Sequence, residues 1–178
     1  MNRSYLQKFQ IKDVVFLAIM SAVALATCAV MPLVISLQPL IFGISQLVTA
    51  LQIGVFFAIG LYKVRKPGSL LIMALMMGLI QLMMSPPMFL SSVLNGILIE
   101  LIVLLLFRGY EKDSAVFCAA MLHTPLLLPF NYLYNRLIKG ADSPLAAVAD
   151  RAPLAAVGMT LAVVAVSALG ALIGIKIA

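Results

Sequence analysis

Residues 153–175 read PLAAVGMTLAVVAVSALGALIGI and contain no charged side chain. At about 1.5 Å of rise per residue, a helix of this length crosses the hydrocarbon core of a bilayer, which is about 30 Å thick. Five more apolar runs precede it, and they are separated by basic or proline-containing stretches. We therefore expect an all-α integral membrane protein. Its expected spans cover residues 14–37, 40–61, 69–84, 89–107, 115–137 and 153–175.

The composition supports one membrane domain over residues 1–178. Of the 178 residues, 64% are apolar and 10% are charged, and the mean hydropathy is +1.17. A soluble domain has about 45–50% apolar and about 25% charged residues, which excludes a cytosolic enzyme and a disordered chain. There is no Gly-rich phosphate loop, serine elbow or HExxH motif. We therefore expect no catalytic residues, no metal site and no cofactor in this chain.

The basic residues predict the orientation in the membrane. Nine of them fall in segments on the side of the N-terminus and three on the other side. The first group is Arg3, Lys8, Lys12, Lys63, Arg65, Lys66, Arg108, Lys112 and Lys176, and the second is Arg136, Lys139 and Arg151. Because cytoplasmic loops are enriched in Lys and Arg, both termini should be cytoplasmic in a multi-pass plasma-membrane protein. This distribution accounts for the net charge of +6 without a nucleic-acid partner. The longest outward connection, residues 138–152, is a candidate lid.

A stripe of small residues runs along the first expected span. Ala18, Ala22 and Ala26 recur every fourth residue and share one helix face, with Ser21 beside it. Such stripes let two membrane helices approach closely. The stripe could dock a partner subunit, or it could pack against another span of the same chain. For a second pair of small residues, Gly170 and Gly174, we expect packing within the chain.

Two ionisable residues lie inside expected spans. Glu100 and His123 each lie about eight residues from the inner end of their span, or about 12 Å above the inner edge. Adjacent antiparallel helices could bring them into contact as a buried polar pair. Such a pair could be structural, or it could bind a ligand or relay protons.

Other polar residues gather toward the outer ends of the third to fifth spans. Pro125 and Pro129 interrupt the fifth span just below them, which frees backbone carbonyls beside a cavity or a neighbouring helix. Amide, hydroxyl and aromatic groups suit a small organic ligand, although outward Tyr, Asn and Arg can also be interfacial anchors. The expected substrate-binding residues are Gln81, Asn95, His123, Asn131, Tyr134 and Asn135.

Three stretches resemble the substrate-binding S component of an energy-coupling factor (ECF) type ABC transporter. They are IKDVVFLAIMSA (11–22), VRKPG (64–68) and NGILIEL (95–101). The resemblance implies a six-helix bundle that binds a vitamin or related micronutrient near the outer face. It also implies that the Ala18, Ala22 and Ala26 face docks on an EcfT-like membrane coupling subunit, which two ATPase subunits drive. The chain lacks the N-terminal histidine of the nickel and cobalt branch and the tryptophans of some thiamine-type members.

Other functions stay open from the residues alone. The chain could be a structural membrane subunit of a cell-wall or rod-shape complex, which would need no outward polar cavity. It could also be a stand-alone ion-coupled carrier that uses Glu100 and His123. A haem-type ligand could use His123 and a wall of methionines, which include Met73, Met76 and Met77.

Overall fold

The protein is described from a computed structural model, which covers residues 8–28, 34, 37, 40–138 and 144–178. The end of the first expected span therefore lies partly outside the described residues. Within them, the chain is helical and contains no strand. Its helices are α1 (Ile11–Thr27), α3 (Ile44–Val64), α4 (Ser69–Leu82), α5 (Pro86–Phe107), α6 (Asp113–Leu137), α7 (Pro144–Arg151) and α8 (Pro153–Ile177).

Four of these helices, α3, α5, α6 and α8, are long and apolar enough to cross a membrane. Helix α4 is apolar but has 14 residues, and α1 has 17. Large apolar side chains on the outer faces of α5 and α8 are exposed, including Leu105, Leu154 and Leu161. Such faces suit contact with lipid acyl chains. The chain is therefore a multi-pass membrane protein.

Local sequence determines where the helices begin. Ser69 and Pro153 begin α4 and α8 at the expected residues. Helix α5 begins at Pro86 rather than at residue 89, because proline fits the first helical turn, where its missing N–H has no partner to lose. Helix α6 begins at Asp113 rather than at residue 115, since a carboxylate in the first turn complements the helix dipole. The short helix α7 lies within the expected connection and was not predicted.

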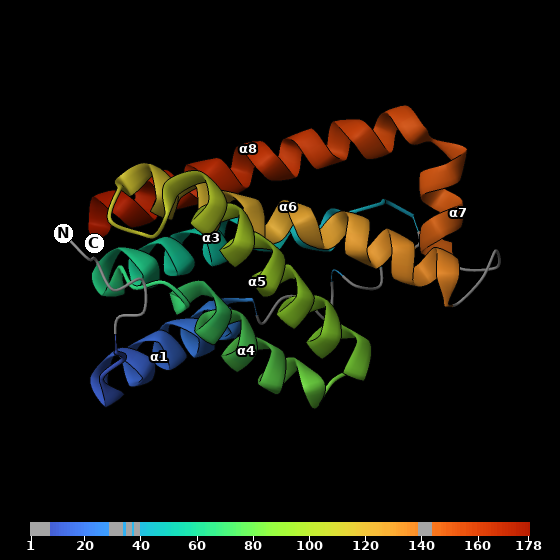
Figure 1. Cartoon of the computed structure of the whole chain (residues 1–178). Helices are drawn as coiled ribbons and strands as arrows, with labels where there is room; N and C mark the ends of the chain where they lie inside the picture. The colour runs from blue at the N-terminus through green and yellow to red at the C-terminus, as the bar shows by residue number, and fades with distance from the viewer. Residues whose placement is uncertain (1–7, 29–33, 35–36, 38–39, 139–143) are drawn as a thin grey trace.

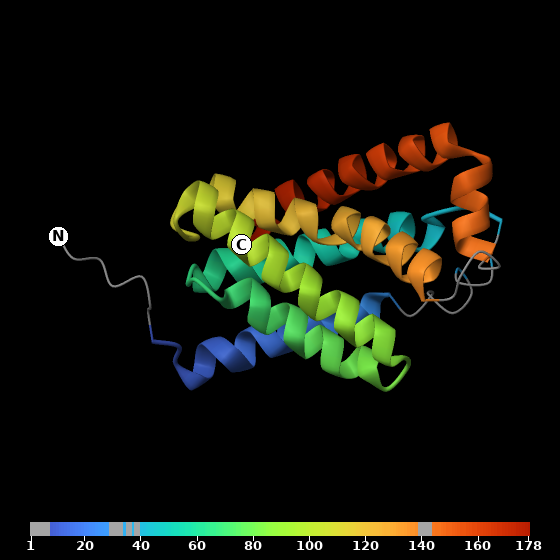
Figure 2. The same cartoon turned by 45° about the vertical axis from the view of Figure 1, so that its right-hand side comes forward.

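Helix α3 is the centre of the bundle. It packs against α1 on one side and against α6 and α8 on the other, while α4 packs against α1 and α5. Figures 1 and 2 both show α8 and α1 on opposite sides of the bundle with α3 between them. The core that these helices enclose is mainly apolar, and Leu17, Phe57, Met73 and Ile99 are fully buried in it together with a smaller number of polar side chains.

Glycine determines how closely α3 and α8 approach. A Cβ on Gly170 would lie 2.5 Å from the Leu51 carbonyl oxygen, and a Cβ on Gly54 would lie 2.9 Å from the Ser167 carbonyl oxygen. A Cβ on Gly174 would collide with the Val55 carbonyl oxygen. The expected internal packing of Gly170 and Gly174 is thus confirmed, because small residues let the two backbones come into contact.

The two ends of the bundle differ in composition. One end holds the start of α1, the α3–α4 turn, the α5–α6 loop and the end of α8 (Figure 1). It carries most of the described basic residues, among them Lys12, Lys63 and Arg108. We call it the basic end. The opposite end holds α7, which lies across the ends of α6 and α8.

Candidate functional site

Helix α1 has one packed face and one bare face. Leu17, Ser21 and Ala24 are buried against the bundle, and the Ser21 hydroxyl donates to the carbonyl oxygens of Leu17 and Met73 at 2.9 and 3.2 Å. Ala22 and Ala26 are exposed, and Ala18 is half-buried. Ser21, which lies beside the alanine stripe as expected, therefore belongs to the packed face. No described part of the chain covers Ala22 and Ala26, so this alanine face is accessible.

The α3–α4 turn, residues 65–68, joins several elements at the basic end. The Arg65 guanidinium donates to the Glu111 carbonyl oxygen at 2.7 Å and to the Asp113 carboxylate at 2.6 Å. Lys66 Nζ donates to the Asp13 carboxylate at 2.6 Å. This hydrogen bond is the main reason that the pKa of Asp13 is lowered from its ordinary value of 3.8. The turn thus ties the start of α1 and the start of α6 to the end of α3.

The Glu100 carboxylate binds the same turn from inside the bundle. It accepts from the Gly68 N–H at 2.7 Å and from the Tyr110 hydroxyl at 2.9 Å. Gly68 has φ 93, a left-handed conformation that glycine adopts without strain. Burial, and then the nearby Glu100 carboxylate, raise the pKa of Tyr110 well above its ordinary value of 10.0, so its hydroxyl stays a donor. Glu100 therefore accepts a hydrogen bond from the backbone N–H that precedes α4, and it also holds the α5–α6 loop in place through Tyr110.

A second buried polar group lies where α5 and α6 pack together. The Asn95 amide donates to the backbone carbonyl of His123 at 2.7 Å. The His123 ring packs against the Phe57 ring of α3, with centroids 4.3 Å apart. Asn95 Oδ1, both His123 ring nitrogens and Thr124 Oγ1 are buried and accept or donate no hydrogen bond within the described structure. Leaving such groups unpaired is costly, so we treat this polar cluster (Asn95, His123 and Thr124) as a candidate site.

Glu100 and His123, which we expected to be able to come into contact, are not hydrogen-bonded to each other. Glu100 binds Gly68 and Tyr110, whereas the ring nitrogens of His123 have no described partner. Because α6 begins two residues earlier than expected, His123 lies about 3 Å farther from the basic end. At that height it meets Asn95, which lies more than one helical turn beyond Glu100.

The remaining expected binding residues lie apart from the polar cluster. Asn131, Tyr134 and Asn135 are half-buried on the last turns of α6, and the Asn135 amide donates to the Asn131 carbonyl oxygen at 2.7 Å. Gln81 is half-buried at the end of α4, which packs against α1 and α5. The structure therefore joins Asn95 to His123, and Asn131 to Asn135, but does not gather all six residues around one point.

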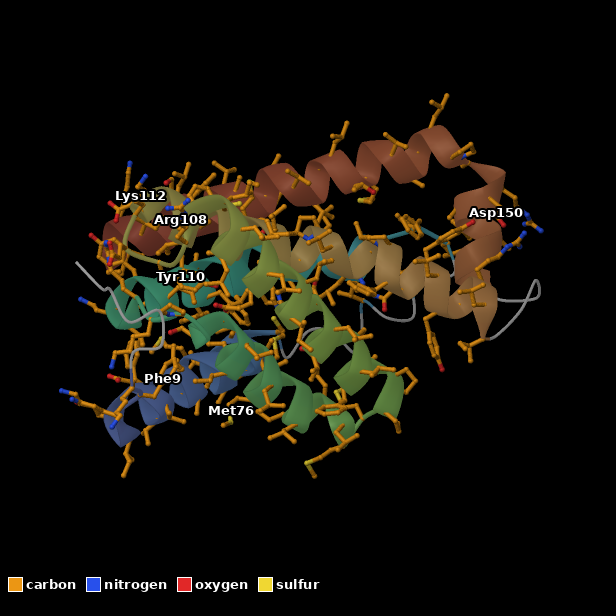
Figure 3. All side chains as sticks on the ribbon, in the orientation of Figure 1. Phe9, Met76, Arg108, Tyr110, Lys112 and Asp150 are labelled. Carbon is orange, nitrogen blue, oxygen red and sulfur yellow. The ribbon has the colours of Figure 1, made fainter. Side chains whose placement is uncertain are left out.

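Helix α7 is fastened to α6 at the same end. The Asp150 carboxylate accepts from the Tyr132 hydroxyl at 2.7 Å and pairs with the Arg136 guanidinium at 3.2 Å. Figure 3 shows Asp150 at the far end of the bundle from the labelled residues of the basic end. These contacts hold α7, which is part of the connection that we expected to act as a lid, against the end of α6.

Sequence reasoning missed Tyr110 and Thr124. Tyr110 lies in the α5–α6 loop, where a tyrosine is ordinarily an interfacial anchor, and no sequence signal indicates that it points inward. Thr124 follows His123 directly in the chain, and this position could have indicated that Thr124 belongs to the same site. Among the described residues, no group of three or more His, Cys, Asp and Glu side chains could hold a metal ion.

Comparisons with known proteins give a family. No curated protein and no solved structure matches the chain. A family described as "Hypothetical bacterial integral membrane protein (Trep_Strep)" matches residues 11–178, which include all the described helices. The chain therefore belongs to this family of bacterial integral membrane proteins.

Proposed function

We propose that this protein is the S component of an ECF-type transporter. It binds a small organic micronutrient from the outer face and delivers it to the cytoplasm with an EcfT-like coupling subunit and two ATPase subunits. In this proposal the chain crosses the membrane six times, both termini are cytoplasmic, and ATP hydrolysis belongs to the partners. The chain itself has neither catalytic residues nor a cofactor.

The observation that carries the proposal is the alanine face of α1. A helix that packs through Leu17, Ser21 and Ala24 leaves Ala22 and Ala26 bare on its other side. Large side chains such as Ile19 flank them and are exposed as well. Small side chains between larger apolar ones form a shallow groove into which a second membrane helix can pack closely. Lipid alone gives no reason for alanine at every fourth position.

The polar cluster supports the ligand-binding part of the proposal. Polar side chains inside a membrane bundle mark binding or transport pathways by default. The polar cluster lies deeper in the bundle than Asn131 and Tyr134. These two half-buried residues are between the cluster and the end that holds α7. A ligand that entered from that end would meet amide and aromatic groups first and the polar cluster last.

The docking test compares two exposed alanines. Ala22→Leu would fill the groove on α1, and Ala165→Leu adds the same side chain to the exposed face of α8. The tagged chain is expressed together with the coupling subunit and ATPases of the same bacterium. We expect Ala22→Leu to lose the copurifying subunits and Ala165→Leu to retain them. Equal recovery of the complex by both variants would refute docking through α1.

The binding test uses native mass spectrometry of the purified chain. We expect the unmodified protein to carry a copurified small molecule. Asn131→Leu should lose this molecule. Removing a hydrogen-bonding partner of the bound molecule should weaken the binding free energy by about 1–3 kcal/mol. Ala22→Leu should retain it, because docking and binding use different surfaces. A bound compound that survives in Asn131→Leu would move the site elsewhere.

A further inference from the structure

We propose that the α5–α6 loop, residues 108–112, binds the headgroup of a negatively charged phospholipid, with Arg108 and Lys112 as its cationic partners. This inference concerns the basic end of the bundle, so it does not depend on the proposed transport function. Both side chains are exposed. The loop joins the ends of two membrane-crossing helices, which sets it at the level of the lipid headgroups.

The loop is held rigidly, with its two cations outward. Tyr110, between them, is fully buried, and its hydroxyl donates to Glu100 inside the bundle. On the next residue, the Glu111 carbonyl oxygen accepts from the Arg65 guanidinium at 2.7 Å. Figure 3 shows Arg108 and Lys112 at the edge of this end of the bundle, with Tyr110 nearer to its middle. A headgroup would therefore meet two cations whose backbone positions are already fixed, so only their side chains need to be ordered on binding.

The acidic groups nearby are largely engaged by other residues. Arg65 pairs with Asp113 at 2.6 Å and Lys66 pairs with Asp13 at 2.6 Å, while Glu100 is buried beneath the loop. Glu111 is exposed between the two cations of the loop. Because two other basic residues neutralise Asp13 and Asp113, the charge that Arg108 and Lys112 present to the membrane surface is positive.

The helix next to the loop offers a surface for acyl chains. Leu105 and Leu106, in the last turn of α5, are 81% and 69% exposed. They lie one turn or less from Arg108 and on the membrane side of it. A cationic loop above exposed apolar side chains complements both parts of an anionic phospholipid, and clusters of this kind attract such lipids.

The test measures lipid retention by the purified full-length chain. Native mass spectrometry is carried out after exposure to equimolar phosphatidylglycerol and phosphatidylcholine with identical acyl chains. The variant is Arg108→Asn with Lys112→Gln, since asparagine tolerates the left-handed backbone at position 108 (φ 62). The control, Arg136→Gln with Arg151→Gln, removes two basic residues from the opposite end.

We expect the unmodified chain and the control to retain phosphatidylglycerol in excess. In the double variant this excess should fall about 25-fold, since each of the two cations near an anionic surface contributes about fivefold. Lys112→Gln alone leaves the left-handed position untouched, and it should lose about fivefold. Equal retention of the two lipids by the unmodified chain would overturn the proposal. So would an equal loss in the control, which would indicate a general effect of charge.

Discussion

The packing of α3 against α8 can be tested by adding one methyl group. In Gly170→Ala, the new Cβ would lie 2.5 Å from the Leu51 carbonyl oxygen and 3.2 Å from the Leu51 carbonyl carbon. On the same helix, Gly158→Ala adds a Cβ with nothing within 4 Å. Both changes give the helix the better propensity of alanine, which contributes about 0.5–1 kcal/mol. The difference between the two variants therefore reports the contact with α3 alone.

The magnitude follows from the geometry. A methyl carbon and a carbonyl oxygen ordinarily lie about 3.3–3.6 Å apart, so α8 must move away from α3 by about 1 Å at this point. The obstacle is backbone, which has no alternative rotamer. Overpacking of this kind costs about 1–3 kcal/mol. We therefore expect Gly170→Ala to be less stable than Gly158→Ala by about 1–3 kcal/mol.

The assay is unfolding by SDS titration in mixed micelles, followed by circular dichroism because the chain has no tryptophan. The two variants and the unmodified protein are compared at one temperature. If Gly170→Ala unfolds at the same SDS fraction as Gly158→Ala, the close contact between α3 and α8 is refuted, and with it the arrangement of α3 at the centre of the bundle.

Three more predictions concern single contacts between the helices and loops of the bundle. Tyr110→Phe removes the donor to a Glu100 oxygen and should lower the free energy of unfolding by about 1–3 kcal/mol; an unchanged SDS midpoint would contradict this. Ser21→Ala removes a hydrogen bond between α1 and α4 and should lower that free energy by about 0.6 kcal/mol, measured in the same titration. In Lys66→Gln, the pKa of Asp13 should rise toward its ordinary value of 3.8, as read from its carboxyl carbon by NMR. Because the pKa of Asp13 is lowered in the folded protein, the stabilisation by Lys66 is present at neutral pH and is lost as the pH falls through that lowered value.

Much of the fold could be predicted because a bilayer imposes strict lengths and polarity. Long apolar runs predicted the four helices that can cross a membrane, which are α3, α5, α6 and α8. The Pro67-Gly68 turn and Pro153 predicted approximately where α4 and α8 begin, because proline and glycine mark turns and proline fits the first helical turn. Helix α7 was missed because residues 139–151 were interpreted as one polar connection, although five of the eight residues of α7 are leucine, alanine or valine.

The site was harder to predict. Counting residues along a span indicates how deep a side chain lies in the membrane, but not which neighbouring helix the side chain faces. Counting residues placed Glu100 and His123 at similar depths, but it could not tell which neighbour each would face. Glu100 turns toward the α3–α4 turn and His123 toward Phe57. The neighbour that each side chain faces depends on which helices pack side by side. That packing depends in turn on glycines whose close contacts are visible only in the folded structure.

The central claim is that this chain works with an ATP-driven coupling module. Its most direct test is affinity purification of the tagged, unmodified chain from the membranes of its own bacterium, followed by quantitative mass spectrometry. Our account predicts an EcfT-like membrane subunit and a pair of ATPase subunits in amounts comparable to the chain. Recovery of the chain alone, or together with cell-wall synthesis proteins, would contradict it.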